Sequence, residues 1–165
     1  MTACHDTSAW GPSTSVRETH FRRIVVGVDG TPNSIAALRI AVGLAVSDAA
    51  TVEAVCAYHP YLESEYAFAG ASGPIDAATD AEATLMNAVF SAFGRAAVDC
   101  LTLRAIEGNP HAVLADAAAT ADLLVVGARR NGRLLGLLHG STAQACTRHA
   151  SGPVLVVPAS EPSAR

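Results

Sequence analysis

The residues best suited to chemistry lie in one glycine-rich stretch, VVGARRNGRLLGLLHGST, which spans Val125–Thr142. Glycines let the main chain curl so that several N–H groups converge on an anion. Ser141 should open a helix, whose N-terminus carries unpaired N–H groups and a partial positive charge. The stretch therefore predicts a phosphate cradle, which a triphosphate fits, with these candidate residues: Gly127, Arg129, Arg130, Gly132, Arg133, Gly140, Ser141 and Thr142.

A plainer interpretation of this stretch stays open. In it, the segment is a solvent-exposed connection between a strand and a helix, and Gly140–Ser141 only caps the helix. Asp29 has two interpretations as well: it contacts the ligand, or it only caps the turn at Gly30. No second carboxylate or histidine pairs with Asp29 to suggest general acid–base catalysis, and His-Gly-Ser-Thr-Ala is not a hydrolase GxSxG elbow. We expect no catalytic residues and no enzyme activity, with weak ATP hydrolysis as the alternative.

Composition excludes several other functions. All eleven basic residues are arginine, so catalytic lysines and the lysine of a Walker A loop are absent. The net charge of −4 argues against binding nucleic acid. The cysteines and histidines lack metal-site spacing, and no apolar run is long enough for a membrane span. Scattered cysteines without CxxC spacing are expected to be buried thiols in a reducing cytoplasm.

Strand and helix patterns must position the candidate residues. Short apolar runs predict strands, and apolar residues at helical spacing predict helices. The runs at 24–29, 51–58, 100–106, 122–127 and 153–158 predict five strands, and helices are expected from 32, at 76–97, at 110–119 and at 141–150. Thr31–Pro32 and Asn109–Pro110 are cap-plus-proline helix starts. This alternation indicates an α/β fold with a parallel sheet, helices on both faces and a ligand site at the carboxyl ends of the strands.

We divide the chain into a flexible leader at 1–20, one domain at 21–158 and a flexible tail at 159–165. The domain resembles the universal stress protein family through IVVGVDGTPNS, TVEAVCAY, EGNP, VVGARRNGRLLGLLHGST and SGPVLVVP. The resemblance implies a flavodoxin-like, Rossmann-like domain with strand order 3-2-1-4-5. It also implies a cytoplasmic homodimer that pairs through the last strand and functions in stress-response signalling.

Many members of this family bind ATP through a motif of glycine, two residues, glycine, nine residues, glycine and then serine or threonine. Gly127, Gly140 and Ser141 match the motif, whereas Arg130 replaces its second glycine. A non-glycine residue costs about 1–2 kcal/mol if that position requires a positive φ, although an arginine could instead neutralise phosphate charge. The resemblance also implies nucleoside contacts from Gly27, Val28, Asp29 and Ala57, with Val126 leading into the phosphate loop.

The predicted function is adenine-nucleotide binding in a stress-signalling homodimer with an unknown regulatory protein partner. The ligand is ATP, with AMP or cyclic AMP as alternatives, and Mg²⁺ accompanying ATP would be held mainly by phosphate oxygens and water. The rival interpretation is a protein-interaction module of the same fold that has lost nucleotide binding, for which Arg130 is the evidence. Val154, Leu155, Val156 and Val157 are the predicted dimer strand, with an ordinary core strand as the alternative.

Overall fold

The computed structural model describes residues 20–60, 76–128 and 141–158. Five parallel strands form a single sheet in the order β3-β2-β1-β4-β5, as predicted. The strands are β1 (Arg23–Gly27), β2 (Thr51–Tyr58), β3 (Leu101–Glu107), β4 (Leu123–Gly127) and β5 (Val154–Val157). All observed strands lie within one or two residues of their predicted bounds. The chain adds β2 and β3 on one side of β1 and adds β4 and β5 on the other side. The strand order therefore reverses between β1 and β4.

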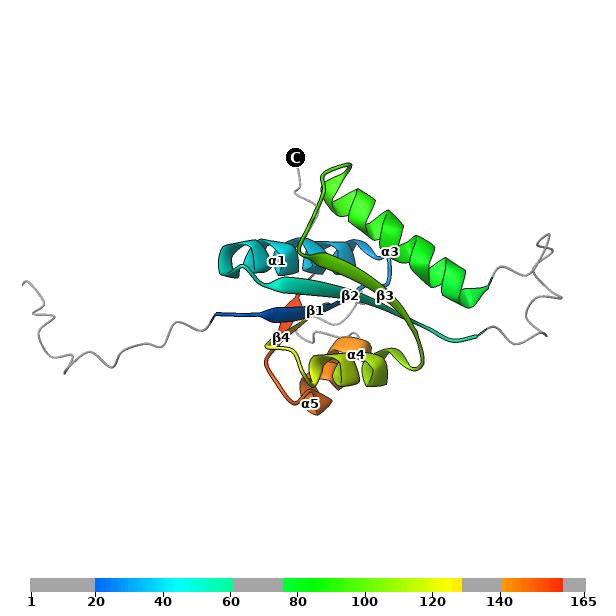
Figure 1. Ribbon diagram of the computed structural model, residues 1–165. Helices are drawn as coiled ribbons and strands as arrows, with labels where there is room; N and C mark the ends of the chain where they lie inside the picture. The colour runs from blue at the N-terminus through cyan, green and yellow to red at the C-terminus, as the bar shows by residue number, and fades with distance from the viewer. Residues whose placement is uncertain (1–19, 61–75, 129–140, 159–165) are drawn as a thin grey trace, which may run out of the picture.

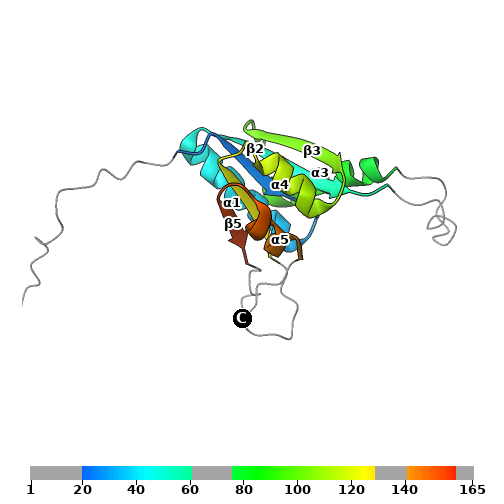
Figure 2. The ribbon, with the colours of Figure 1, turned by 90° about the horizontal axis from the view of Figure 1, so that it is seen from below.

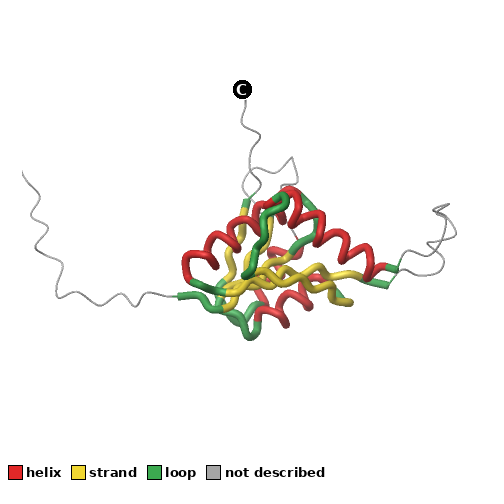
Figure 3. Tube along the Cα trace, turned by 45° about the horizontal axis from the view of Figure 1, so that its top comes forward, coloured by secondary structure: helices red, strands yellow, loops and turns green. Residues whose placement is uncertain are grey.

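Helices cover both faces of this sheet (Figure 1). One face carries α1 (Pro32–Asp48) and α3 (Ala77–Phe93), and the other carries α4 (Pro110–Ala118) and α5 (Ser141–His149). The view from below shows α4 and α5 side by side across the sheet (Figure 2), and the tube shows the strands layered between the helices (Figure 3). None of the helices in the described ranges is long and apolar enough to span a membrane.

The predicted helix starts are confirmed by their capping bonds. The Thr31 hydroxyl accepts a hydrogen bond from the Ser34 N–H, and the Asn109 side chain accepts one from the His111 N–H. These bonds satisfy N–H groups that the first helical turn leaves without a helical partner. α1 and α4 therefore begin at Pro32 and Pro110, after short turns that follow β1 and β3.

The end of α3 differs from the prediction. The helix was expected to reach Ala97, but it stops at Phe93. Gly94 adopts a φ of +65°, which glycine takes at little cost, and its N–H donates to the Phe90 carbonyl. The glycine terminates the helix four residues earlier than the apolar spacing indicated.

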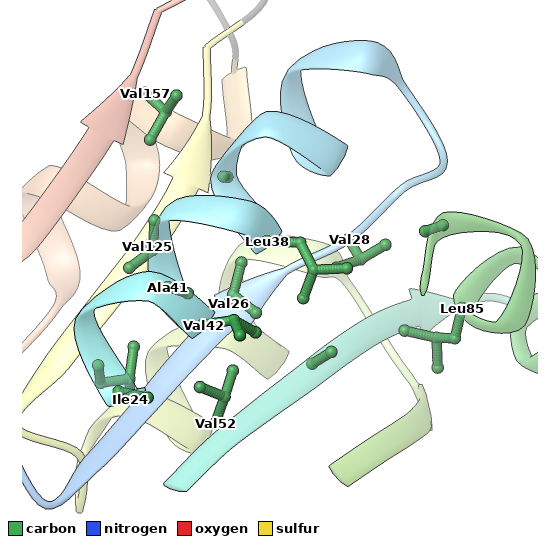
Figure 4. Close-up of a cluster of buried hydrophobic side chains, with 14 of the residues drawn as sticks. Ile24, Val26, Val28, Leu38, Ala41, Val42, Val52, Leu85, Val125 and Val157 are labelled. Carbon is green, nitrogen blue, oxygen red and sulfur yellow. The ribbon is translucent and has the colours of Figure 1, made fainter. Parts of the chain in front are cut away.

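The larger part of the core lies between the sheet and the helices α1 and α3. Ile24 and Val26 of β1 and Val52 of β2 pack against Leu38 of α1, and Leu85 of α3 closes the cluster (Figure 4). These side chains are almost entirely excluded from solvent. A second cluster on the opposite face packs strand residues against α4 and α5. The sheet is thus rigidly held from both sides, which fixes the positions of its strand ends.

A charged cluster lies away from those ends, on β1, β2 and β3. Glu53 is 8% exposed and accepts hydrogen bonds from Arg23 at 2.5 Å and from Arg104 at 2.8 Å. Arg23 also donates to the Thr120 hydroxyl and to the Ala117 carbonyl. Burial by itself would raise the pKa of Glu53, but the hydrogen bonds and charges of the two arginines together hold that pKa below its ordinary value. The cluster links three strands and the end of α4.

Candidate functional site

A cavity of about 230 Å³ opens at the carboxyl ends of β1 and β4, where the strand order reverses. Ligands of open α/β sheets bind at this position because the connections diverge to opposite faces and leave a crevice. Seven of the predicted nucleotide-binding residues line the cavity: Gly27, Val28, Asp29, Ala57, Val126, Gly127 and Thr142. The fold therefore brings together residues from four separate parts of the chain.

The other predicted site residues cannot be placed in this way. Arg129, Arg130, Gly132, Arg133 and Gly140 lie outside the described residues. Ser141 is the first residue of α5, but its side chain lies outside the description as well. The described part of the site therefore consists of the cavity at the strand ends and the start of α5, which reaches it through Thr142 and Ala143.

Asp29 follows β1 and has a structural role in the turn. Its Oδ1 accepts hydrogen bonds from the Thr31 N–H at 3.1 Å and from the Thr31 hydroxyl at 2.5 Å. Its own N–H donates to the Ser34 hydroxyl at 3.2 Å. The turn-capping role is thus present, and the same residue also lines the cavity. These bonds order the carboxylate, so the two roles are compatible.

The cavity is otherwise formed by small and apolar residues. Asp29 is the sole charged residue among its described lining, and Ser34 and Thr142 supply hydroxyl groups. Val55, Val126 and Leu114 provide an apolar surface that suits a flat, uncharged ring system. On the far side of β2, burial and then the nearby charge of Asp29 raise the pKa of the Cys56 thiol.

Close packing accounts for both glycines at the strand ends. A Cβ at Gly127 would lie 2.6 Å from the Asn33 carbonyl carbon and 2.8 Å from the Ser34 nitrogen. A Cβ at Gly27 would lie 2.8 Å from Leu114 Cδ1. Gly127 thus lets β4 rest on the first turn of α1, and Gly27 lets α4 pack onto β1. The sequence motif pointed to Gly127 as a phosphate contact, and the structure adds a packing reason for this glycine.

Sequence reasoning missed five residues that line the cavity: Ser34, Val55, Pro110, Leu114 and Ala143. A signal existed for Pro110, because the helix that it begins follows β3 and so starts at the same edge of the sheet as the site. Ser34 is 4% exposed, and its hydroxyl also donates to the Thr31 carbonyl at 3.0 Å. The available signal for Ser34 was its position in the first turn of α1, which directly follows the loop that contains Asp29.

The described residues contain no group of three or more histidine, cysteine, aspartate or glutamate side chains that could hold a metal ion. A second, more open concavity of about 380 Å³ lies between the end of β2 and the first turns of α3, and its lining includes Cys56, His59 and Asp80. It shares Ala57 with the first cavity.

Comparison with known proteins agrees with the fold. The universal stress protein family model matches residues 20–158. A universal stress protein solved in complex with cAMP is 26% identical, with a TM-score of 0.56; the alignment covers 84% of this chain and 98% of that one. No curated protein sequence matches significantly.

Two further solved structures have the same fold. Universal stress protein UspA from Lactobacillus plantarum is 20% identical, with a TM-score of 0.62 and coverage of 84% of this chain and 99% of that one. A universal stress protein from Archaeoglobus fulgidus in complex with dAMP is 20% identical, with a TM-score of 0.59 and the same coverage. Because the family model spans most of the chain, this protein belongs to the universal stress protein family.

Proposed function

We propose that this protein binds an adenine nucleotide in the cavity at the ends of β1 and β4 and that occupancy regulates its contacts in the cytoplasmic stress response. The observation that carries the proposal is the convergence of seven predicted nucleotide residues on that one cavity. The relative that is 26% identical was solved with cAMP, which supports an adenine nucleotide as the ligand class.

The chemistry of the cavity favours one orientation of the ligand. Asp29 is negatively charged and would repel phosphate, whereas a carboxylate accepts hydrogen bonds well from ribose hydroxyls. The start of α5 contributes Thr142 and the positive end of a helix dipole, which favours an anion. The nucleoside therefore lies by Asp29 and the phosphates lie toward α5. If ATP is the ligand, an accompanying Mg²⁺ would be held mainly by phosphate oxygens and water.

The protein acts as a binding protein rather than an enzyme in this proposal. Asp29 is the sole titratable side chain in the described lining, and a general acid–base mechanism needs a positioned proton donor or acceptor with a suitable pKa. β5 lies at an edge of the sheet and consists of four aliphatic residues. Among the described residues no strand pairs with its outer side, and such an edge suits antiparallel pairing with a second copy of the chain.

Isothermal titration with ATP, AMP and cyclic AMP tests the proposal. We expect saturable binding of at least one ligand and, in Asp29→Asn, a loss of affinity of about tenfold or more, because hydrogen bonds to charged groups contribute about 1.5–3 kcal/mol. Asn retains an oxygen that can accept from Thr31. Asp116→Asn, an exposed position on α4, is the matched control and should bind as the wild type does.

Absence of heat for all three ligands would refute nucleotide binding and favour the interaction-module alternative. One specific observation favours that alternative: Arg130 stands where the family motif has its second glycine. It predicts that Arg130→Gly gains ATP affinity. His139 directly precedes Gly140–Ser141 of the motif, so steady release of phosphate from ATP that is abolished by His139→Ala would instead favour the slow ATPase.

A further inference from the structure

Two adjacent residues in the first turn of α1 hold the two chain segments that flank the cavity. The Ser34 hydroxyl accepts a hydrogen bond from the Asp29 N–H at 3.2 Å, so Ser34 holds the chain after β1. The Asn33 side chain donates from Nδ2 to the Ala128 carbonyl oxygen at 2.5 Å, so Asn33 holds the chain after β4. The two residues thus connect α1 to the segments that follow β1 and β4.

The segment held by Asn33 has little room to move. Ala128 is fully buried, and its N–H donates to the Val157 carbonyl at 2.8 Å. Its carbonyl oxygen is held by Asn33 on the other side. The preceding Gly127 touches the backbone of α1 so closely that even one added carbon would collide with Asn33. The point at which the chain leaves β4 is therefore fixed from three directions.

We infer that Asn33 is a positioning residue for the phosphate-bearing part of the ligand. This inference rests on the proposed function, in which the phosphates lie away from Asp29, between Gly127 and α5. Removing the Asn33 amide leaves the buried Ala128 carbonyl without that donor, and such a group costs free energy until the chain shifts to find another partner. The shift displaces Gly127, which lines the cavity, while the nucleoside contacts beside Asp29 are still held by Ser34.

A purely structural role for Asn33 predicts a different pattern. Loss of a structural bond would lower the stability of the protein and would leave the relative affinities for different ligands unchanged. A positioning role changes the ratio of the affinities for ATP and for adenosine, which lacks phosphate. That ratio is the diagnostic quantity.

The test compares Asn33→Ala with Asn87→Ala, which removes the same amide from an exposed position on α3. Isothermal titration with ATP and with adenosine gives the affinity of each variant for each ligand. We expect Asn33→Ala to lose about tenfold or more in ATP affinity, less than twofold in adenosine affinity, and Asn87→Ala to match the wild type. Asn33→Asp, which has the same shape but cannot donate to a carbonyl when ionised, is the second variant and should show the same selectivity.

Equal losses for ATP and adenosine in both Asn33 variants, or no loss in either, would overturn the positioning role while leaving the proposed function intact. Failure of the wild type to bind any of ATP, adenosine, AMP and cyclic AMP would overturn the proposed function and this inference together. Ser34→Ala distinguishes the two ends of the cavity, because it should weaken adenosine and ATP by similar factors.

Discussion

Replacing Gly127 with alanine should destabilise the fold because backbone atoms occupy the space that the new methyl group needs. The added Cβ would lie 2.6 Å from the Asn33 carbonyl carbon, 2.7 Å from its oxygen and 2.8 Å from the Ser34 nitrogen. Favourable carbon contacts begin near 3.5 Å, so β4 and the first turn of α1 must separate by about 1 Å. Overpacking typically costs about 1–3 kcal/mol, and we expect about 3 kcal/mol here because neither neighbour is a flexible side chain.

Two other glycines provide matched comparisons. At Gly27 the new Cβ would meet Leu114 Cδ1 at 2.8 Å, and a side-chain methyl group can move aside, so we expect a loss of about 1 kcal/mol. Gly43 lies within α1, and apart from its chain neighbours and the backbone of its own helix no described atom would lie within 4 Å of an added Cβ. Alanine should therefore stabilise the protein at that position by up to about 1 kcal/mol, the difference in helix propensity.

Urea unfolding monitored by far-UV circular dichroism measures the free energy of unfolding of the wild type and of the three alanine variants. The protein concentration is held constant, because association would make the apparent stability depend on it. The expected order of stability is Gly43→Ala, wild type, Gly27→Ala and then Gly127→Ala, with similar denaturant slopes. An unchanged urea midpoint for Gly127→Ala would refute the close-packing argument, and a loss of stability in Gly43→Ala would refute the claim of open space at that site.

Two further predictions concern the charged cluster and the thiols. Glu53→Gln should lower the free energy of unfolding at pH 7 by about 1–3 kcal/mol. Because the native pKa of Glu53 is lowered, the stability that its carboxylate contributes is complete above the ordinary pKa of 4.5 and is lost as the pH falls through the native pKa. Urea titrations should therefore show a smaller difference in unfolding free energy between variant and wild type at pH 3 than at pH 7. An equal difference at both pH values would contradict this origin. Among the three cysteines that the structure describes, burial raises the pKa of Cys56 and Cys146, whereas Cys100 is only partly buried. Iodoacetamide at pH 7.5 should therefore modify Cys100 before Cys56 and Cys146, which should react after unfolding. Peptide mass mapping gives the order, and early modification of Cys56 would show that its strand is more accessible than the structure indicates.

Much of the fold followed from local sequence signals. Apolar runs identified all five strands, and Thr31–Pro32 and Asn109–Pro110 marked two helix starts that the structure confirms. The predicted end of α3 was wrong because the apolar spacing continues past Gly94, whereas the backbone conformation of that glycine stops the helix. Helix ends depend on a single residue's φ, which a periodic pattern does not reveal.

The candidate site was partly predictable for a different reason. Carboxyl ends of parallel strands meet at one edge of the sheet, so Asp29 and Gly127 could be grouped from strand positions, whereas Ala57 was predicted from the family resemblance. Leu114 and Ser34 line the same cavity, but their places depend on the rotation of α4 and α1 about their axes. The bond from Asn33 to Ala128 joins residues 95 positions apart and appears only when both segments are in place.

The central claim is that an adenine nucleotide occupies the cavity at the ends of β1 and β4. Titration of ¹⁵N-labelled protein with cyclic AMP, followed by amide NMR shifts, tests it residue by residue. The account predicts the largest shifts at Val28, Asp29, Ala57 and Gly127, with negligible shifts at Thr102 and Leu103, which lie toward the amino end of β3. Saturable shifts that cluster away from the cavity, or no shifts at millimolar cyclic AMP, AMP and ATP, would contradict it.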